Sequence, residues 1–592
     1  MVFSPDGKVI ASAGIWGRVL LWDTVSGEIL HSFKSTDPKT VAAVSALVPA
    51  FYQLNYQVTA DGKWGFQRET NGRVNIFDFH TNEVRASLFT FDGLEWLAVT
   101  PDGFFDGTPG AWRQVIWRFN NNTFDYAPVE AFFNEFYYPG LLADIFAGKR
   151  PRAPSDISQK DRRQPQLKLT LANAQTKETP KASDADRNPT VKEGARNVSV
   201  KIDLSELAAD KEHKTGSGAQ DVRLFRNGSL VKVWRGDVLK GQSSVTLEAI
   251  VPIVAGENKF TAYAFNHDSI KSSDAELIVT GADSLRRQGT AYILAIGIDK
   301  YANRRYNLKY AVADAVDFAA EVKRQQESLM RYAQVKIIPL SDAQATKSNI
   351  TNKLAELAKQ VQPEDAVIVF FAGHGTAQGN QFYLIPHDLG YTGPRENLTA
   401  AGLQTILDHS ISDRELEKLF EGIDAGQLLL VIDACNSGQA LEAEEKRRGP
   451  MNSKGLAQLA YEKGMYVMTA AQSYQAAMEA SKFGHGFLTY ALVEEGLKKG
   501  SADHEPKNGS IDIREWLNFA TDEVPRMQEN NSREALRGRN RYVVFVGDGR
   551  SLGIPKTEAD ARDNIQRPRV FYRRELEANP LIVAAVGAGA PQ

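Results

Sequence analysis

From about residue 288 the chain alternates short apolar runs with helical periods, and this pattern constrains the fold more than any other feature of the sequence. The apolar runs are 291–297, 335–339, 366–373, 427–434, 465–470 and 541–547. Segments with helical spacing separate them at 312–325, 348–361, 413–423 and 486–499. Near-continuous apolar strands joined by helices predict an α/β domain over residues 288–550, with a mainly parallel sheet of six strands covered on both faces.

Two of these expected strands are followed directly by residues that can carry chemistry. The run 366–373 precedes His374 and Gly375, and the run 427–434 precedes Cys435. Ligands bind outside the carboxyl ends of strands in open α/β sheets, and the helix 413–423 makes these two strands expected neighbours. A Cys–His pair suits acyl transfer, because the thiolate attacks and the imidazole handles the proton. The backbone N–H groups of Gly375 and Cys435 are candidates for an oxyanion hole.

These residues also have interpretations other than catalysis by a Cys–His pair. A free cysteine is often a packing residue, and Cys435, the only cysteine of the chain, can form no internal disulfide or Cys-rich zinc site. His485 opens a helix instead of ending an apolar strand, and His387 lies in an expected loop after LIP (384–386), so both are weaker candidates for the base than His374. An α/β-hydrolase esterase would need a Gly-x-Ser-x-Gly elbow, and residues 434–438 lack its first glycine. Together, the two strand-end residues flanked by glycine favour chemistry.

At this point the sequence resembles a known family. FFAGHGT (370–376) and LLLVIDACNSG (428–438) look like the catalytic signatures of caspase-like cysteine peptidases, in particular the metacaspase and orthocaspase branch. Four further segments follow the order of that domain, AYILAIGIDKY (291–301), LKYAVADA (308–315), FYLIPHD (382–388) and GHGFLTYALVEEG (484–496).

The resemblance implies a role for each matching residue. It implies that His374 and Cys435 form the catalytic dyad. It also implies that Asp433 and Asp314 are the acidic residues of a pocket that selects Arg or Lys by charge pairing. The sequence departs from the common pattern at Asn436, where a His often stands, and at Ala372, where a Ser often stands and would supply a pocket hydroxyl.

The first 118 residues carry a repeat. FSPDGK (3–8) is followed by VLLWD (19–23), VTADGK (58–63) by VNIFD (74–78), and a weaker copy begins at VTPDGF (99–104). Asp-Gly turns between alternating runs predict antiparallel hairpins, and the pattern resembles WD-repeat β-propeller blades. Two or three blades do not close a propeller. We therefore expect a partial, propeller-like segment over 1–118, for which either upstream blades are missing from this chain or the segment packs elsewhere. The whole chain resembles bacterial proteins that join WD repeats to such a peptidase domain.

Three further segments complete the expected organisation. Residues 119–163 form an aromatic-rich connector that ends in an exposed Pro- and Arg-rich linker. Residues 164–283 contain six short alternating runs and the turn Asn227-Gly228, which predict a β-sandwich of the immunoglobulin type. Residues 551–592 are expected to be a tail.

Composition excludes several classes of function. The net charge of −3 gives no electrostatic case for nucleic acid or an anionic membrane. With a single cysteine and no visible targeting or membrane-spanning segment, we expect a cytoplasmic protein. Calcium activates many metacaspases. The carboxylates near the expected site are Asp388, Glu442, Glu444 and Glu445, and their spacing is not that of calcium ligands. The sequence therefore predicts no cofactor or metal.

The sequence therefore predicts a cysteine endopeptidase that cleaves proteins or peptides after Arg or Lys. The propeller-like and sandwich segments would bind protein partners or restrain the enzyme. The alternative is an interaction scaffold whose peptidase domain is inactive. The basic triplet Lys446–Arg448, in a loop that begins at the active-site rim, is either a self-processing site or a solvated charge cluster.

Overall fold

The computed structural model describes most of the chain. The described residues are 2–3, 9–13, 18–24, 27, 29–34, 56–59, 62–69, 72–91, 95–120, 122, 125–172, 195–378, 381–394, 398–436, 454–470, 478–480, 484–504, 507–536, 544–546, 551–552, 566–575 and 580–586. The loop with the basic triplet Lys446–Arg448 lies outside them, as do Glu442, Glu444 and Glu445.

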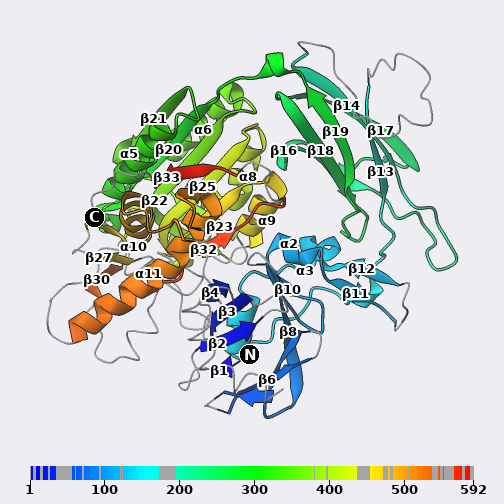
Figure 1. Ribbon diagram of the computed structural model, residues 1–592, viewed down its shortest axis with the longest axis horizontal. Coiled ribbons are helices and arrows are strands. Elements are labelled where there is room, and N and C mark those ends of the chain that lie inside the picture. Colours follow the sequence, from blue (N-terminus) through cyan, green and yellow to red (C-terminus); the bar gives the residue numbers. More distant parts are fainter. Residues whose placement is uncertain are drawn as a thin grey trace.

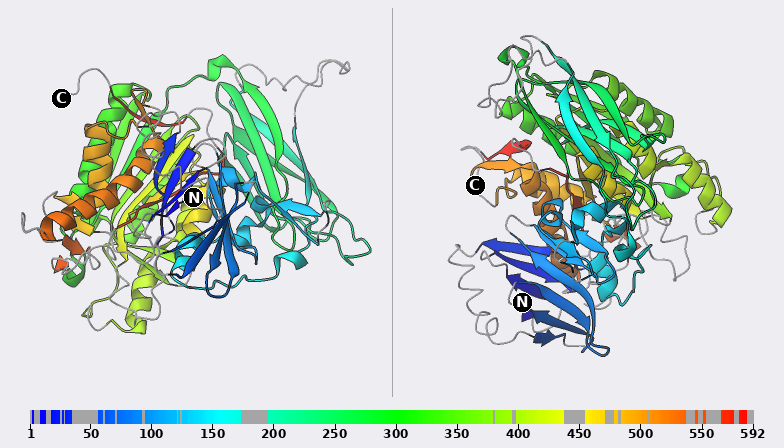
Figure 2. Two further views of the ribbon diagram at one scale, coloured as in Figure 1. Left: turned by 60° about the horizontal axis from the view of Figure 1, so that its bottom comes forward. Right: turned by 90° about the vertical axis from the view of Figure 1, so that its right-hand side faces the viewer.

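Three regions are visible in the ribbon (Figure 1). The N-terminal sheets lie at the bottom in blue, a module of two sheets lies to the right in teal and green, and the α/β region fills the upper left. The right-hand view of Figure 2 places the N-terminal sheets and the two-sheet module at opposite ends. The molecule is therefore multidomain, and sheet dominates its N-terminal half.

The N-terminal region folds into two antiparallel sheets. One has the order β1-β2-β3-β4 and the other the order β10-β9-β8-β7-β6-β5. Gly62 and Gly103, in two of the predicted Asp-Gly turns, have φ of +70° and +101°, a conformation that glycine adopts without strain. The strands are β1 (Val2–Phe3), β2 (Val9–Ala13), β3 (Arg18–Asp23), β4 (Ile29–Lys34), β5 (Tyr56–Val58), β6 (Trp64–Arg68), β7 (Val74–Asp78), β8 (Glu83–Thr90), β9 (Trp96–Val99) and β10 (Phe105–Gly107). The hairpins match the sequence pattern, and the propeller assignment stays a prediction.

The connector is packed against the rest of the molecule. The aromatic side chains of Phe132, Phe133, Phe136 and Tyr137 are buried in the core that also holds the α/β sheet. Two elements lead into it, α2 (Pro109–Trp112) and β11 (Ile116–Arg118), and its own elements are β12 (Tyr126–Pro128), η2 (Val129–Phe132), α3 (Phe133–Phe136), α4 (Leu141–Phe146) and η3 (Ile157–Gln159). Its aromatic richness is therefore explained by burial between regions.

Residues 166–281 form two antiparallel sheets, β13-β14-β17 and β16-β15-β18-β19, which share one apolar core. Asn227 and Gly228 join β15 to β16 with φ of +49° and +76°, the two positive values that a type I′ hairpin turn requires. The strands are β13 (Gln166–Leu171), β14 (Asn197–Ser205), β15 (Gln220–Arg226), β16 (Ser229–Asp237), β17 (Ser244–Pro252), β18 (Gly256–Phe265) and β19 (Ala275–Gly281). The six predicted strands are present, β13 is additional, and the immunoglobulin assignment stays a prediction.

The α/β region is built on a central sheet with the order β21-β20-β22-β25-β26-β32. The first five strands pair in parallel and β32 is antiparallel. Every residue of β20 is buried, which is why this strand reads as a continuous apolar run. The strands are β20 (Thr290–Gly297), β21 (Gln334–Ser341), β22 (Ala366–Gln378), β25 (Gln427–Asn436), β26 (Tyr466–Thr469) and β32 (Arg569–Phe571), with β23 (Gln381–Ile385) and β24 (Ile411–Ser412) attached to β22.

Helices pack in two groups around this sheet. In one group, α5 packs on β20, β21 and β22 and also contacts η11, which in turn packs on α11. In the other, α8 packs between α6 and α9. The helices are α5 (Ala311–Leu329), α6 (Lys347–Gln360), α7 (Ala400–His409), α8 (Asp413–Glu421), α9 (Lys454–Lys463), α10 (Phe487–Tyr490), η11 (Ala491–Lys498) and α11 (Ile513–Leu536), with short turns η4 (Asp283–Leu285), η5 (Arg304–Tyr306) and η6 (Asp342–Gln344).

Two predictions about the C-terminal residues are wrong. The run 541–547 is not the sixth strand of the central sheet, because β30 (Val544–Val546) pairs with β27 (Met478–Ala480) in a small separate sheet that also holds β28 (His485–Gly486) and β31 (Ser551–Leu552). Residues 551–592 are not simply a tail, because β32 completes the central sheet and β33 (Ile582–Ala585) pairs with β29 (Ser510–Asp512). Strands of three or four residues are too short to show a period in the sequence.

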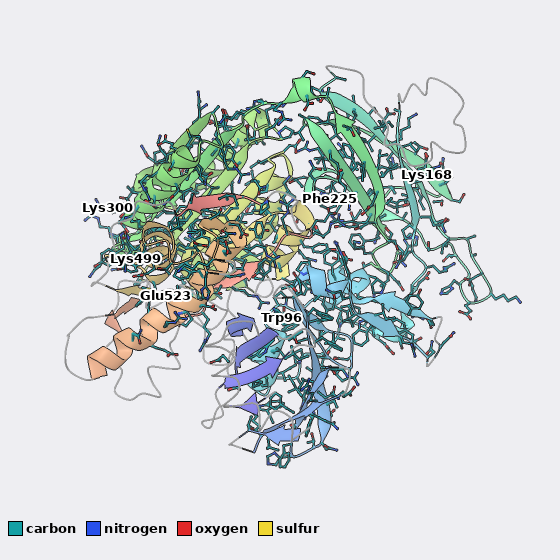
Figure 3. All side chains as sticks on the ribbon, in the orientation of Figure 1. Trp96, Lys168, Phe225, Lys300, Lys499 and Glu523 are labelled. Carbon is teal, nitrogen blue, oxygen red and sulfur yellow. The ribbon has the colours of Figure 1, made fainter. Side chains whose placement is uncertain are left out.

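Buried ion pairs join the C-terminal strand segment to the other regions. Phe225 of the two-sheet module lies at this junction, where the guanidinium of Arg574 is 4.5 Å from its ring centroid (Figure 3). The pairs run from residues 566–575 to each of the other two regions: Arg567–Asp23 at 2.9 Å, Arg569–Asp106 at 2.8 Å and Arg574–Asp274 at 2.7 Å. One short segment thus contacts both N-terminal regions.

No helix among the described residues combines the length and the apolar character needed to cross a bilayer.

Candidate active site

The site is built where β22 and β25 run side by side. In the parallel register, His374 lies opposite Cys435 and Gly375 lies opposite Asn436. Both strands continue through these residues instead of ending before them, because β22 extends to Gln378 and turns back as β23. The sequence-predicted pair is therefore juxtaposed by backbone register.

The imidazole of His374 is fully buried and held from two sides. Its Nε2 lies 2.7 Å from the carbonyl oxygen of Tyr306. A carbonyl can only accept a hydrogen bond, so Nε2 carries the proton and Nδ1 is the nitrogen that can take one up. The backbone N–H of His374 donates to the hydroxyl of Tyr301 at 2.7 Å, and the Tyr301 ring lies 4.9 Å from the imidazole.

Glycine on each side of His374 makes room for aromatic neighbours. A Cβ at Gly373 would lie 2.9 Å from the Tyr301 hydroxyl, and a Cβ at Gly375 would lie 2.9 Å from the ring of Phe382. Any larger residue would displace one of these rings. Gly375 lies in the ladder between β23 and β25, and its oxyanion role stays a prediction.

The two predicted pocket carboxylates lie together. Asp433, two residues before Cys435 in β25, is 9% exposed, and Asp314, in the first turn of α5, is 3% exposed. A Cβ placed on Gly486 would meet Asp433 Oδ2 at 2.9 Å and Asp314 Oδ2 at 3.3 Å, so both side chains flank the same glycine. Residues far apart in sequence therefore form one buried acidic pair.

Burial disfavours the ionised form of both carboxyl groups. Burial, together with the neighbouring Asp433 charge, raises the pKa of Asp314 to about 7, against the hydrogen bond from His485, which lowers it. Burial likewise raises the pKa of Asp433 to about 6, against the effect of Thr489. Adjacent buried carboxylates of this kind favour a cation that would neutralise them.

Three residues around the acidic pair were not anticipated in these roles. His485 Nδ1 lies 2.9 Å from Asp314 Oδ1, and the N–H of Gly486 donates to both Asp314 oxygens at 3.2 Å. The Thr489 hydroxyl donates to Asp433 Oδ2 at 2.7 Å. In the sequence His485 is a candidate only for the base. The glycines on both sides of it, Gly484 and Gly486, are the sequence signal that the backbone approaches another group closely at this point.

Ala372, at the position where the family pattern often has Ser, lies beside the acidic pair in the structure. Ala372 lies opposite Asp433 in the parallel register of β22 and β25. A hydroxyl at this position would lie next to the carboxylate. Here Thr489, from α10, supplies a hydroxyl to Asp433 from another element. The pocket therefore has a hydroxyl, although its source is not the one that the family pattern implies.

The remaining predicted candidates lie apart from this pair. His387 follows β23, and its Nδ1 lies 2.6 Å from the carbonyl oxygen of Lys300. Asp388 accepts a hydrogen bond from the backbone of Lys347, the first residue of α6. Among the described residues, no group of three or more His, Cys, Asp or Glu side chains is arranged to hold a metal ion.

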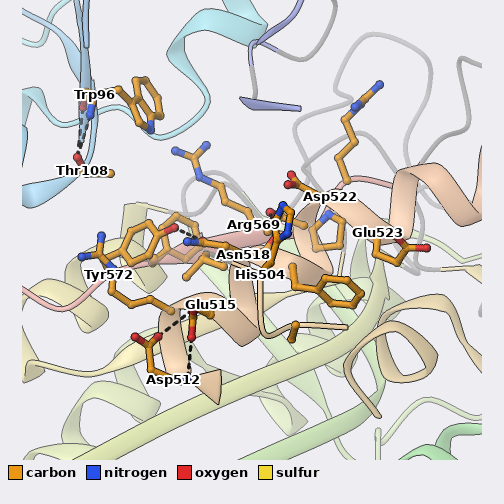
Figure 4. A pocket seen from close by; sticks show the side chains of 18 of the residues that line it. Trp96, Thr108, His504, Asp512, Glu515, Asn518, Asp522, Glu523, Arg569 and Tyr572 are labelled. Carbon is orange, nitrogen blue, oxygen red and sulfur yellow. Dashed lines mark hydrogen bonds between the residues drawn. The ribbon is translucent and has the colours of Figure 1, made fainter. Parts of the chain in front are cut away.

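A separate cavity of about 660 Å³ lies between the N-terminal region and the α/β region (Figure 4). Its walls include Trp96 and Thr108 on one side and Asn518, Arg569 and Tyr572 on the other. The arginines of its wall are paired with carboxylates, as for Arg514 with Glu95 at 3.4 Å. The cavity therefore presents a mixture of already paired charges.

Comparison with known proteins places the α/β region in a family. Residues 290–544 match the family model of the caspase domain. The chain carries a caspase-like domain. This domain includes His374, Cys435, Asp314, Asp433 and His485, and the match supports cysteine-type peptidase activity.

Other comparisons are distant. No curated protein matches the chain. Among solved structures it is similar to protein GSU0716 from Geobacter sulfurreducens, with 15% identity over 40% of this chain and 89% of that one, and a TM-score of 0.28. It is also similar to fibronectin(III)-like modules of CbhA from Clostridium thermocellum, with 13% identity over 19% of this chain and 96% of that one, and a TM-score of 0.12. Such low TM-scores support no argument about fold or function.

Proposed function

We propose that this protein is a cysteine endopeptidase of the metacaspase type that cleaves peptide bonds after Arg or Lys. The observation that carries the proposal is the register of β22 and β25, which sets His374 opposite Cys435 two residues beyond the buried Asp433. His374 takes the thiol proton at Nδ1, and the Cys435 thiolate attacks the scissile carbonyl carbon. The C–N bond breaks as His374 passes this proton to the leaving amine, which leaves a thioester. Water then attacks the thioester with His374 as base, so the new carboxylic acid leaves and the thiol is restored.

The acidic pair supports basic specificity. Asp314 and Asp433 lie on either side of Gly486 in a buried site, and an Arg or Lys side chain would neutralise them. A guanidinium can engage carboxylates through two parallel hydrogen bonds, so we expect Arg to be preferred over Lys. Uncharged or acidic side chains at this position would leave the pair uncompensated.

The N-terminal sheets and the two-sheet module are proposed to bind protein partners or to restrain the peptidase. They contact the caspase-like domain through Arg567, Arg569 and Arg574, which lie within or next to the edge strand β32. A propeller-like identity for the first region and a cytoplasmic location belong to the same proposal. The substrates would be proteins or peptides with an accessible basic residue.

The dyad is tested with fluorogenic peptides that end in Arg, Lys or Asp, with and without calcium. Cys435→Ala and His374→Ala should each reduce cleavage by at least about a thousandfold, since nucleophile and base act as a unit. His387→Ala is the matched control and should retain activity, because its imidazole lies apart from the predicted dyad and is held by the backbone carbonyl oxygen of Lys300. Substantial turnover by Cys435→Ala would refute the mechanism, and a wild type that cleaves no peptide would favour the scaffold alternative.

A further inference from the structure

His485 makes contacts that neither catalysis nor substrate charge pairing accounts for. It lies in β28, and its side chain is 14% exposed. Nδ1 is 2.9 Å from Asp314 Oδ1, and Nε2 is 3.1 Å from Asp317 Oδ2. The two aspartates are three residues apart on α5, so the ring bridges one face of that helix.

The protonation state of this ring follows from its partners. Carboxylate oxygens only accept hydrogen bonds, and a neutral imidazole has one donor nitrogen. When both aspartates are ionised, the Nδ1 hydrogen bond to Asp314 and the Nε2 ion-pair contact with Asp317 are both favourable only if the ring is the imidazolium. The hydrogen bond to Asp314 accordingly raises the pKa of His485 above its ordinary value.

The charge balance around the acidic pair then becomes clear. The charged groups that face His485 are Asp314 and Asp317 of α5, Asp433 of β25 and Glu494 of η11. Glu494 is already paired with Lys498 at 2.5 Å, and Asp317 is 43% exposed to water. Of the two buried carboxylates, His485 compensates Asp314, which leaves the charge of Asp433 for a substrate cation.

We propose that His485 is a positioning residue of the specificity pocket, which as an imidazolium bridging Asp314 and Asp317 keeps Asp314 ionised and oriented toward a basic substrate side chain. This inference rests on the proposed Arg/Lys specificity. The pocket then contains one cation of its own, the His485 imidazolium, and binds a second one, the Arg or Lys side chain of the substrate. With His485 in place the pKa of Asp314 is about 7, so this carboxyl ionises around neutral pH. Without His485, burial beside Asp433 would keep Asp314 protonated to a higher pH, and the pocket would offer one carboxylate over a pH range in which the wild type offers two.

The test compares two peptides that differ only in charge, one ending in Arg and one in its uncharged isostere citrulline. Titration of the dyad changes kcat/KM equally for both peptides, so the ratio of the two kcat/KM values depends only on the charge of the pocket. In the wild type this ratio should rise with pH as Asp433 and Asp314 ionise, near their pKa values of about 6 and about 7. In His485→Ala the midpoint of the rise should move up by about one to two pH units, the effect expected from losing one charge-assisted hydrogen bond.

The variants separate this role from a merely structural one. His485→Asn keeps a donor near the Nδ1 position, so its midpoint should lie between those of the wild type and His485→Ala. The loss in His485→Ala should appear in KM and should largely disappear well above the shifted midpoint. An equal loss at every pH, or an unchanged midpoint, would overturn the proposal.

A matched control exists in the two-sheet module. His213 also lies between two aspartates, with Nδ1 3.0 Å from Asp210 and Nε2 3.6 Å from Asp161. His213→Asn removes a similar bridge outside the caspase-like domain, and the Arg-to-citrulline ratio should not change at any pH. A shifted midpoint in this variant as well would show that the effect is not specific to the pocket, and would overturn the proposal.

A second measurement does not depend on cleavage. In full-length Cys435→Ala protein with labelled histidine rings, the His485 signal among the nine histidines is assigned by its loss in His485→Asn. Its pKa should lie above about 6.5 and fall by about one unit or more when Asp314→Asn is added. A value at or below 6.5 would overturn the role of His485 even if the enzyme cleaves after Arg. The predicted titration in a protein that cleaves nothing would instead refute only the proposed function.

Discussion

This protein has two clusters of charged side chains that are largely removed from water, and the pKa values of their carboxyl groups are shifted in opposite directions. In the pocket of the caspase-like domain, burial raises the pKa values of Asp314 and Asp433. At the junction of the regions, Glu130 and Asp274 are also buried, yet their pKa values are lowered, because Lys271 and the nearby arginines outweigh the desolvation.

The difference lies in the number of cations that the fold itself supplies. Asp274 is paired with Lys271 at 2.8 Å and with Arg574 at 2.7 Å, and Arg113 adds a third cation within the same cluster by pairing with Glu130. The proposed pocket has two buried carboxylates and, by our proposal, one imidazolium. A cluster that the fold neutralises holds regions together, whereas a cluster left with excess charge is suited to receive a ligand.

The largest expected effect comes from breaking the neutralised cluster. Arg574→Met removes the buried guanidinium that the half-buried Asp274 and Glu575 share and leaves Asp274 with Lys271 alone, so it should reduce the free energy of unfolding by about 3 kcal/mol. Denaturant unfolding of the full chain measures this loss. Arg286→Met is the control, because Arg286 pairs with Asp283 at a similar distance of 2.9 Å but on the surface. Equal destabilisation by both variants would mean that burial does not distinguish these pairs.

The next effect concerns the pocket. Asp433→Ala should lower kcat/KM for Arg-ending peptides by tens- to thousandfold, the effect of losing a desolvated charge pair worth about 2–5 kcal/mol. Cleavage of citrulline-ending peptides should fall much less. A wild type that prefers Asp-ending peptides, or a variant that loses both activities equally, would contradict the assignment.

A pH-dependent effect of intermediate size distinguishes the clusters in the wild type. The Arg-to-citrulline ratio of kcat/KM should rise between about pH 5 and pH 8, because the pocket carboxylates must ionise to bind a cation. The stability supplied by Glu130 and Asp274 is instead present above their unfolded pKa values and is lost as pH falls through the lowered folded values. As the pH is lowered, the preference for Arg over citrulline should therefore disappear at a higher pH than the one at which the regions separate. Unfolding followed at each pH measures the loss of the contacts between regions.

The smallest effect is a gain in stability. The folded pKa of Asp314 is raised, so its contribution to stability is fully present below the unfolded pKa and is lost as pH rises toward about 7. Asp314→Asn should therefore be more stable than the wild type at pH 8 by about 1 kcal/mol, and equal to it near pH 4. Thermal unfolding at both pH values measures the difference. A variant less stable than the wild type at pH 8 would show that the His485 bridge contributes more than the buried charge costs.

Much of the fold followed from local sequence. The runs at 291–297, 366–373 and 427–434 became β20, β22 and β25, and Asn227-Gly228 formed the expected hairpin turn. The sixth strand did not follow, because Arg569–Phe571 is three residues long and becomes a strand only by pairing with β26. In the sequence Arg569 and Arg574 look like part of a polar tail, although both are buried and paired with carboxylates of other regions, Asp106 and Asp274.

The sequence by itself determined the kinds of residue and their strands: His374, Cys435 and Asp433 near the carboxyl ends of two parallel strands. Only the tertiary structure decided how these strands are registered and that β28 brings His485 to Asp314, 171 residues earlier in the chain. The physical reason is that hydrophobic periodicity is a local property of the sequence. The balance of buried charge depends on side chains that only folding brings together.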